Sequence, residues 1–151
     1  MSDVEQSERT YNILLVEDDL GDAGLVRIAI RRGSYPVTLH HVKNANEAFG
    51  FLRRIGVDYV TAPRPDLIFL DLNLPGRSGH EILEELKGDP SLRGIPVVVL
   101  STSEAERDVA KAYQMGANSF LSKPMDVEDF TQAIHGVQDY WFRLVSLPGE
   151  S

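Results

Sequence analysis

The sequence predicts an α/β fold, a doubly wound parallel sheet of five strands with helices on both faces. Five short apolar segments alternate along the chain with five segments in which apolar residues recur at helical spacing. This alternation is the pattern of consecutive βα units. Several strand segments, such as residues 13–16 with the letters ILLV, are apolar without interruption, which is typical of strands buried on both faces.

Local patterns give the expected bounds of these elements. The strands are expected at residues 13–16, 37–42, 67–70, 97–100 and 119–121. The helices are expected near residues 25–32, 45–55, 79–87 and 104–115, with a last helix from about 126 past 141 toward 148. Gly33, Gly56 and Gly116 stop three of the helices. Two prolines lie in a loop over 56–66 that is long for a βα connection.

Composition indicates one domain and narrows the class of partner. A chain of 151 residues, 42% of them hydrophobic, suits a single core, with residues 1–11 as a disordered lead-in and 12–148 as the domain. The net charge of −8 argues against binding nucleic acid through its phosphates. The absence of cysteine excludes disulfides and thiolate metal sites. With no signal peptide and no apolar run near the length of a membrane helix, we expect a cytoplasmic protein without a membrane partner.

Polar residues follow four of the five expected strands. In open α/β sheets, ligands bind beyond the carboxyl ends of the strands. The second strand ends in nothing comparable. The residues that follow the other four are Glu17, Asp18 and Asp19 after the first, Asp71 and Asn73 after the third, Ser101, Thr102 and Ser103 after the fourth, and Ser122, Lys123 and Pro124 after the fifth.

These side chains together suit phosphoryl chemistry with a magnesium ion. The carboxylates of Glu17, Asp18 and Asp71 would repel one another and resist joint ionisation unless a cation lay among them. Ligands that are all oxygen suit Mg²⁺, which takes one or two carboxylates, waters and a phosphate. The amine of Lys123 and the hydroxyl of Ser101 would receive phosphoryl oxygens. One carboxylate could then be a nucleophile that forms an aspartyl phosphate.

Each of these groups also has an ordinary structural explanation. Residues 17–19 could merely cap the next helix, and Asp71 could be a turn residue. Ser101 could cap a helix, a role that Ser103 would serve equally well. Residues 123–124 could be a plain loop. The functional interpretation is favoured because four separate strand ends supply complementary groups to one edge of the sheet.

The segments LLVEDD, LIFLDLNLPGRSG, VVVLSTS and FLSKP, in this order and at this spacing, resemble the defining segments of response-regulator receiver domains. The resemblance covers roughly residues 12–136. It implies a flavodoxin-like sheet with strand order 2-1-3-4-5, an order that the periodicity does not provide. It also implies a two-component phosphorelay switch rather than an enzyme, one that assists phosphotransfer to its own aspartate and hydrolysis from it.

The resemblance assigns roles at the site. Asp71 would be the phosphoacceptor. The implied Mg²⁺ ligands are Asp18 and Asp71 directly, Glu17 through water, and Asn73 through its backbone carbonyl. At the first acidic position glutamate stands where the family also has aspartate, which lengthens its reach without changing its charge.

The resemblance further implies phosphoryl and switch contacts. Lys123 would pair with the phosphoryl oxygens, and Ser101 would hydrogen-bond to one of them. Phe120 stands at the switch aromatic position but lacks the hydroxyl of tyrosine, so the switch would be steric. Thr102 is bulkier than the alanine or glycine frequent there, which leaves the lifetime of the phosphoryl group open. The Lys123–Pro124 bond would be cis.

Two segments resemble a narrower group, the single-domain regulators that serve bacterial phytochrome histidine kinases. One is the long loop reading TAPRPDLIFLDLNLP, and the other is the tail DYWFRLVSLP. The implied partner is a histidine kinase in a light-sensing pathway, with signalling through the receiver's own surface and no attached output domain. The alternative is that any receiver can carry a longer loop and helix.

Two further functions stay open beside the switch. A magnesium-dependent phosphatase also uses an aspartyl nucleophile, but that class usually has a second aspartate where this chain has Asn73. A degenerate receiver used only for interaction is disfavoured by the full set of acceptor residues.

The tail predicts a homodimer. Apolar residues of the last helix fall on one face, namely Phe130, Ile134, Val137, Trp141, Leu144 and Val145. A helix from Asp126 to Val145 would be about 30 Å long, whereas a five-residue strand spans about 17 Å, so its end should overhang the sheet. Phe142 points well away from the apolar face, and Tyr140 lies at its flank. The candidate dimer contacts are Tyr140, Trp141, Phe142, Leu144 and Val145. The alternative is that the tail folds back over its own domain.

Overall fold

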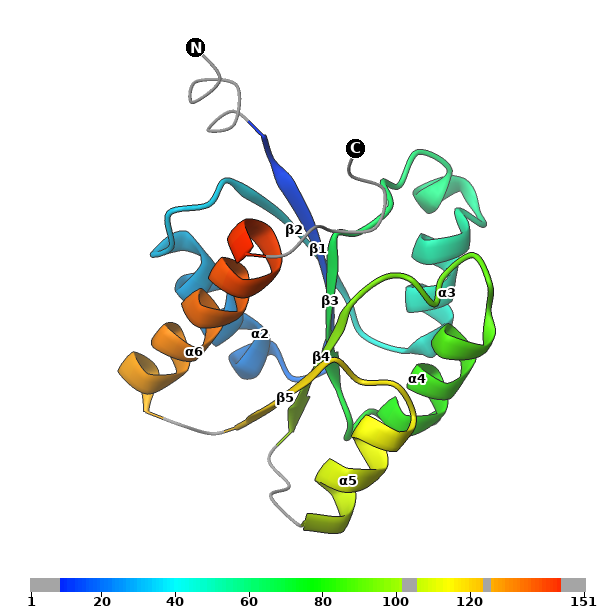
Figure 1. The fold of residues 1–151 in the computed structure, drawn as a ribbon. Helices are drawn as coiled ribbons and strands as arrows, with labels where there is room; N and C mark the ends of the chain where they lie inside the picture. Colours follow the sequence, from blue (N-terminus) through cyan, green and yellow to red (C-terminus); the bar gives the residue numbers. More distant parts are fainter. Residues whose placement is uncertain (1–8, 102–105, 124–125, 145–151) are drawn as a thin grey trace.

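Five strands form one parallel sheet in the order β2-β1-β3-β4-β5, as the resemblance implied (Figure 1). The computed structural model describes residues 9–101, 106–123 and 126–144. The strands are β1 (Tyr11–Val16), β2 (Val37–Val42), β3 (Leu67–Asp71), β4 (Val97–Ser101) and β5 (Ser119–Ser122). The helices are α2 (Leu20–Arg31), α3 (Ala45–Arg53), the 3-10 helix η1 (Val57–Tyr59), α4 (Gly79–Gly88), α5 (Glu106–Gln114), α6 (Val127–Asp139) and the π-helix η2 (Tyr140–Leu144).

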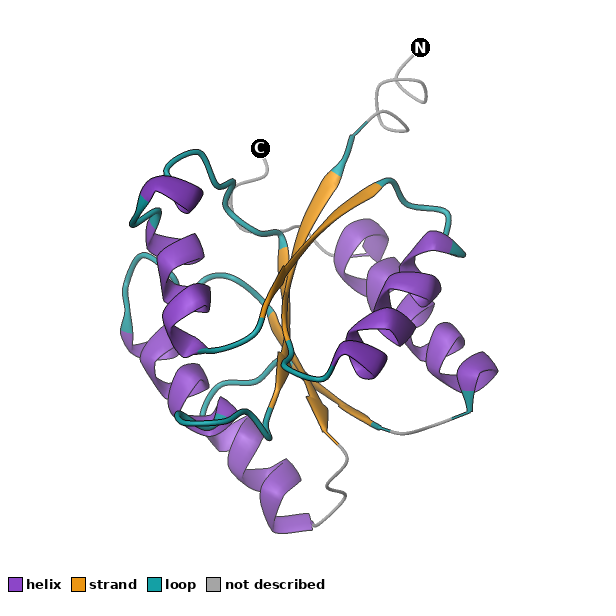
Figure 2. Ribbon diagram, turned by 180° about the vertical axis from the view of Figure 1, so that it is seen from behind, coloured by secondary structure: helices purple, strands orange, loops and turns teal. Residues whose placement is uncertain are grey.

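The sheet lies between two layers of helices. Helices α2 and α6 cover one face, and α3, α4 and α5 cover the other (Figures 1 and 2). Successive strand residues point to opposite faces, so Ile13 and Leu15 join the core under α2 and α6, whereas Leu14 and Val16 join the other core. Covering both faces explains why the inner strands are apolar without interruption. Among the described helices, none has the length and the apolar character needed to cross a membrane.

Helix α2 begins earlier than its apolar spacing suggested. Asp19 is the N-cap residue, and its side chain accepts a hydrogen bond from the backbone N–H of Asp22 at 2.9 Å. The first residue of the helix, Leu20, is largely exposed. The first turn therefore gave little apolar signal. The capping explanation offered for residues 17–19 holds for Asp19.

The loop over 56–66 contains the 3-10 helix η1 instead of being wholly irregular. Helix α3 ends at Arg53, two residues before the expected end, because Arg54 adopts the left-handed conformation with φ 55°. The Arg54 Nε donates a hydrogen bond to the backbone oxygen of Ala62 at 2.7 Å. This contact offsets the conformational cost that a non-glycine residue incurs there.

Strand β1 begins earlier in the chain than expected. Tyr11 opens β1 and is buried, although it fell within the expected disordered lead-in. The guanidinium of Arg9 lies 3.0 Å from Asp66 Oδ1 and 4.6 Å from the centroid of the Tyr11 ring. Residues 1–8 of that lead-in lie outside the described residues.

The tail folds back onto its own domain through Phe142, so the expectation that Phe142 points away from the core was wrong. Its ring stacks on Tyr11 with 4.0 Å between the ring centroids, and meets Tyr35 edge-on at 5.6 Å. The Tyr11 hydroxyl donates to the Phe142 backbone oxygen at 3.3 Å. The reason is the π-helix η2, whose i→i+5 turns are wider than α-helical turns. An α-helical wheel carried past Asp139 therefore misplaces the following side chains.

The other tail residues divide between core, surface and segments that are not described. Trp141 is partly buried against the same core as Phe142, and Tyr140 is half exposed. The backbone of Leu144 belongs to η2, but its side chain and the whole of Val145 lie outside what the structure describes. The expected cis bond before Pro124 and the expected effect of Thr102 also fall on residues outside that part.

Replacing Phe142 by alanine should lower the free energy of unfolding by about 3 kcal/mol, because a buried aromatic ring and its stacking are lost. Replacing the half-exposed Tyr140 by alanine should change it by less than about 1 kcal/mol. Chemical denaturation followed by far-UV circular dichroism measures both. Equal effects of the two substitutions would contradict this account of the tail.

Candidate functional site

The pairing register of the strands brings the expected site residues to one edge of the sheet. Val16 pairs with Leu70, so the next residues, Glu17 and Asp71, are neighbours. Asp71 pairs in turn with Leu100, which precedes Ser101, and Ser101 pairs with Ser122, which precedes Lys123. The carboxyl ends of these strands lie beside the start of α2, at the lower end of the sheet in Figure 1.

Three carboxylates of this edge form one compact group. Each of Glu17, Asp18 and Asp71 offers an oxygen, and these oxygens all lie within 4.8 Å of one another. Glu17 and Asp71 are buried, whereas Asp18 is exposed. Such a set of hard oxygen ligands, partly open to solvent, fits a divalent cation that retains some of its waters.

The electrostatics of Glu17 support that fit. Burial raises the pKa of the Glu17 carboxyl from 4.5 to about 7, and its hydrogen bonding with Asp71 raises it as well. The ammonium of Lys123 acts in the opposite direction but does not overcome these effects. The carboxylates of the site thus carry more negative charge than the Lys123 ammonium balances. A bound divalent cation would relieve this excess.

Lys123 is buried among the carboxylates but is not hydrogen-bonded to Asp71. Its Nζ donates to Glu17 Oε1 and, at 2.9 Å, to Asp22 Oδ2. The distance from Nζ to Asp71 Oδ1 is 3.9 Å. Burial would lower the pKa of the Lys123 ammonium, but the hydrogen bonds to Glu17 and Asp22 outweigh burial and raise the pKa. The ammonium is therefore kept charged where a phosphoryl group on Asp71 would need it.

Asp22 belongs to this arrangement, and the sequence did not single it out. It lies in the first turn of α2 rather than directly after a strand, so reading the strand ends passes over it. Its place three residues after the N-cap Asp19 suggests only a helix start. The contact with Lys123 joins residues separated by 101 positions in the chain, and only the packing of α2 against the sheet edge creates it.

The loop after β3 is shaped around Asp71. The backbone N–H of Asn73 donates to Asp71 Oδ1 at 3.1 Å, and Asn73 Nδ2 donates to Ser101 Oγ at 3.5 Å. The backbone N–H of Gly79 donates to the oxygen of Leu72 at 3.0 Å. A Cβ atom at Gly79 would lie 2.4 Å from the Asp71 backbone oxygen, so any other residue would displace the loop. The local sequence around Gly79 indicated only the start of a helix.

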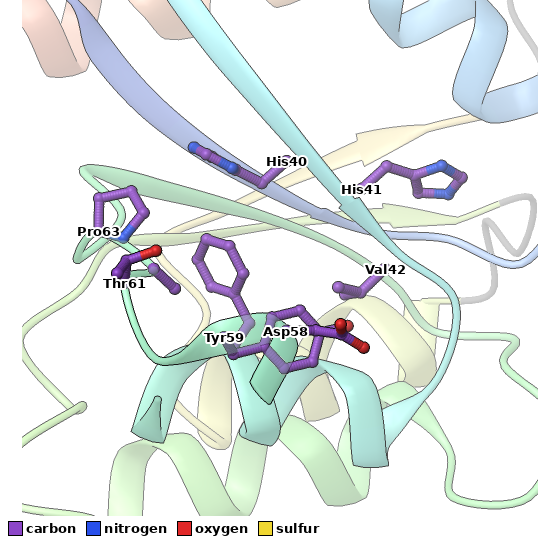
Figure 3. A pocket seen from close by; sticks show the side chains of 9 residues that line it. His40, His41, Val42, Asp58, Tyr59, Thr61 and Pro63 are labelled. Carbon is purple, nitrogen blue, oxygen red and sulfur yellow. The ribbon is translucent and has the colours of Figure 1, made fainter. Parts of the chain in front are cut away.

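Strand β2 contributes to the site from the edge of the sheet. The His41 Nε2–H donates to the backbone oxygen of Glu17 at 2.6 Å, and the His40 Nε2–H donates to Asn12 Oδ1 at 3.1 Å. The two rings point to opposite sides of the strand (Figure 3). A cavity of about 400 Å³ lies between β2 and the loop that contains η1. His41 therefore connects this edge of the sheet to the backbone that presents Glu17.

Phe120, the expected switch residue, lies on β5 opposite Val99 of β4. It is partly buried against the core under α3, α4 and α5. Ser101 pairs with Ser122, which follows Phe120 by two residues on β5. Its role in a switch stays a prediction.

Comparisons with known proteins agree with the geometry. The model of the response regulator receiver domain family matches residues 13–135. The chain is 40% identical over 144 residues to response regulator Rcp1 of Synechocystis sp., which covers 95% of this chain and 97% of that protein. It is 35% identical over 147 residues to the probable methanogenesis regulatory protein FilR2 of Methanothrix harundinacea, covering 97% and 94%.

Solved structures show the same likeness. The phosphorylated cyanobacterial phytochrome response regulator RcpA superposes with a TM-score of 0.86 at 39% identity, covering 93% of this chain and 100% of that one. The Mn²⁺-bound form of Rcp1 superposes with a TM-score of 0.83 at 39% identity, covering 92% and 99%. The similarity thus extends over nearly the whole chain.

Without metal, the stability of the fold should fall as the pH rises from about 4.5 to about 7. The folded state keeps a proton on Glu17 up to about pH 7, whereas the unfolded chain releases it near 4.5, so a rising pH favours the unfolded chain. The raised pKa corresponds to a loss on the order of 3 kcal/mol. Denaturant titrations in chelator measure it, and Glu17→Gln should remove this part of the pH dependence. An unchanged slope in that variant would assign the effect to another group.

Proposed function

Because the chain belongs to the response regulator receiver domain family, we propose that it is a phosphorylation switch whose acceptor is Asp71. One observation carries the proposal. Asp71 ends the central strand β3 within 4.8 Å of two further carboxylates, and the Lys123 ammonium lies 3.9 Å away. A carboxylate beside a cation site and a buried ammonium is the arrangement that a phosphoryl acceptor requires.

The divalent cation of this site is proposed to be Mg²⁺. Glu17, Asp18 and Asp71 would hold it, together with the backbone carbonyl of Asn73. The related Rcp1, which is 39% identical to this chain, has a Mn²⁺-bound structure, and this supports a divalent cation at the site. When bound, Mg²⁺ neutralises negative charge on the carboxylates and on phosphoryl oxygens.

The proposed reaction is a transfer of one phosphoryl group. An Asp71 carboxylate oxygen attacks the phosphorus of a phosphohistidine, forming a P–O bond. The P–N bond breaks, and its electron pair stays on the imidazole nitrogen, which can take a proton from solvent. Lys123 and Ser101 hold the phosphoryl oxygens while the charge redistributes. Attack by water on the same phosphorus later breaks the P–O bond, which returns the carboxylate and inorganic phosphate.

The donor is proposed to be a histidine kinase of the phytochrome type. Support comes from RcpA, a cyanobacterial phytochrome response regulator that is 39% identical to this chain. The tail, which resembled that group in sequence, folds against β1 in the structure through Phe142 and Tyr11. The domain is accordingly proposed to extend beyond the family match at 135, toward residue 148.

Acetyl phosphate with Mg²⁺ should add one phosphoryl group to the wild-type protein and none to Asp71→Asn, which keeps the shape but lacks the nucleophilic oxygen. Intact-protein mass spectrometry measures the added group. Asp58→Asn, which alters a carboxylate of the cavity beside β2, is the matched control and should label fully. Full labelling of Asp71→Asn would refute the acceptor, and many turnovers of phosphate per protein would favour the phosphatase alternative.

We also propose that the protein forms a symmetric homodimer through its tail. Phe142 is no longer a candidate contact, because it is buried against Tyr11 of its own chain. Tyr140 supports the proposal, since half of its surface is exposed at the junction of α6 and η2. Trp141, whose ring meets Tyr140 edge-on, is partly exposed beside it.

Light scattering at tens of micromolar tests the dimer. The wild type should have twice the mass of a monomer, and Tyr140→Arg should dissociate it, because a charge replaces apolar surface at the interface. Tyr113→Arg on α5 changes an equally exposed tyrosine elsewhere and should leave the mass unchanged. A monomeric wild type would end this proposal.

A further inference from the structure

We propose that Asp22 is a positioning residue for Lys123, which holds the ammonium toward α2 and thereby weakens its contact with a phosphoryl group on Asp71. The inference rests on the proposed function, since it concerns the response of Lys123 to phosphorylation. Asp22 would thus be a further acidic residue of the site, one that contacts Lys123 and does not bind the cation.

The hydrogen bonds of the Lys123 ammonium support this positioning role of Asp22. A lysine ammonium has three hydrogen atoms to donate. Two hydrogen bonds run from Lys123 to Glu17 and, at 2.9 Å, to Asp22. The third acidic neighbour, Asp71, is 3.9 Å away, beyond hydrogen-bonding distance. The ammonium therefore lies on the side of Glu17 and Asp22, and a phosphoryl group on Asp71 must draw it away from them.

Asp22 is separate from the proposed cation site. The carboxylates that lie within 4.8 Å of one another are those of Glu17, Asp18 and Asp71, and Asp22 is not among them. Its position is fixed by the helix, because its backbone N–H donates to the N-cap side chain of Asp19 at 2.9 Å. The effect of Asp22 therefore reaches the site through Lys123.

The ion pair is shielded enough to influence the ammonium. The Lys123 side chain is 4% exposed, and the Asp22 side chain is 29% exposed. Solvent and salt weaken such a pair less than they weaken one between two exposed side chains. Losing the Asp22 charge would release the ammonium toward Asp71.

The two ligands of the site should respond to Asp22 in opposite directions. A phosphoryl group is negative, so it competes with Asp22 for Lys123 and binds better when Asp22 is neutral. A divalent cation is repelled by the ammonium, which Asp22 partly neutralises, so it binds less well when Asp22 is neutral. Damage to the folded site would weaken both ligands together.

Beryllofluoride, which mimics a phosphoryl group on an aspartate, and Mg²⁺ alone are the probes. In Asp22→Asn, beryllofluoride at saturating Mg²⁺ should bind about three- to tenfold more tightly, and Mg²⁺ alone about three- to tenfold more weakly. Isothermal titration calorimetry measures both affinities. Asp22→Glu keeps the charge and should return both affinities toward those of the wild type.

The control variant is Glu128→Gln, which removes one acidic charge from α6 at a side chain paired with Arg32. Both of its affinities should stay within about twofold of the wild type, because exposed charges at a distance are screened.

The ¹⁵N resonance of the Lys123 ammonium gives a second measurement. It should shift when beryllofluoride is added to the wild type, and in ligand-free Asp22→Asn the same resonance should already be shifted in that direction.

The outcomes separate this inference from the function on which it rests. If the wild type binds beryllofluoride and Asp22→Asn binds it equally or more weakly, Asp22 does not restrain Lys123 and the inference is wrong while the acceptor function stands. If the wild type does not bind beryllofluoride with Mg²⁺, both are overturned. Opposite shifts of the two affinities, with recovery in Asp22→Glu, support the positioning role.

Discussion

The buried ammonium of Lys123 is the interaction on which the site depends. It lies among carboxylates at the edge where parallel strands end, and it donates directly to Glu17 and Asp22. Removing such an ammonium would leave buried negative charge without compensation, which costs several kcal/mol. The β-strand ladder fixes this geometry, because the register of β1, β3, β4 and β5 brings Glu17, Asp71 and Lys123 together.

The negative charge of this cluster is only partly balanced by Lys123, so the cluster responds to a bound cation or to a phosphoryl group. The pKa values of Glu17 and Lys123 are both raised, Glu17 mainly by burial and Lys123 by its acidic partners. Both directions mean that the folded protein retains protons, as expected where negative charge exceeds positive charge. Binding of a cation would therefore stabilise this site. A phosphoryl group on Asp71 would change the charge there, and with it the hydrogen-bond partners of Lys123. Stability is thus reduced locally where binding is needed.

The opposite end of the sheet has a different task. There Tyr11, Tyr35 and Phe142 form an aromatic cluster that attaches η2 to the first strand of the sheet. Aromatic side chains bury large areas, so this contact contributes stability mainly through packing. Figure 1 shows the first residues of β1 and the end of the described tail near one another, away from the carboxyl ends of the strands. Packing and chemistry therefore occupy different ends of the same sheet.

The sequence by itself determined the elements whose signal is local. Uninterrupted apolar runs located the strands of the sheet interior, and the residues just after them, Glu17, Asp71 and Lys123, were predicted to meet because parallel strands end at a common edge. The order of the strands came only with the resemblance to a family, since periodicity carries no information on which strands are neighbours.

The tertiary structure alone decided the rest. Asp22 meets Lys123 only because the first turn of α2 lies at the same end of the sheet as the loop after β5, and Gly79 is needed only because α4 starts against the backbone of Asp71. Phe142 lies in the core, although an α-helical wheel places it away from the core, because it belongs to a π-helix whose turns are wider. Each of these features depends on contacts between separate elements or on a departure from ideal geometry. Neither leaves a periodic trace in the sequence, which is why local patterns could not reveal them.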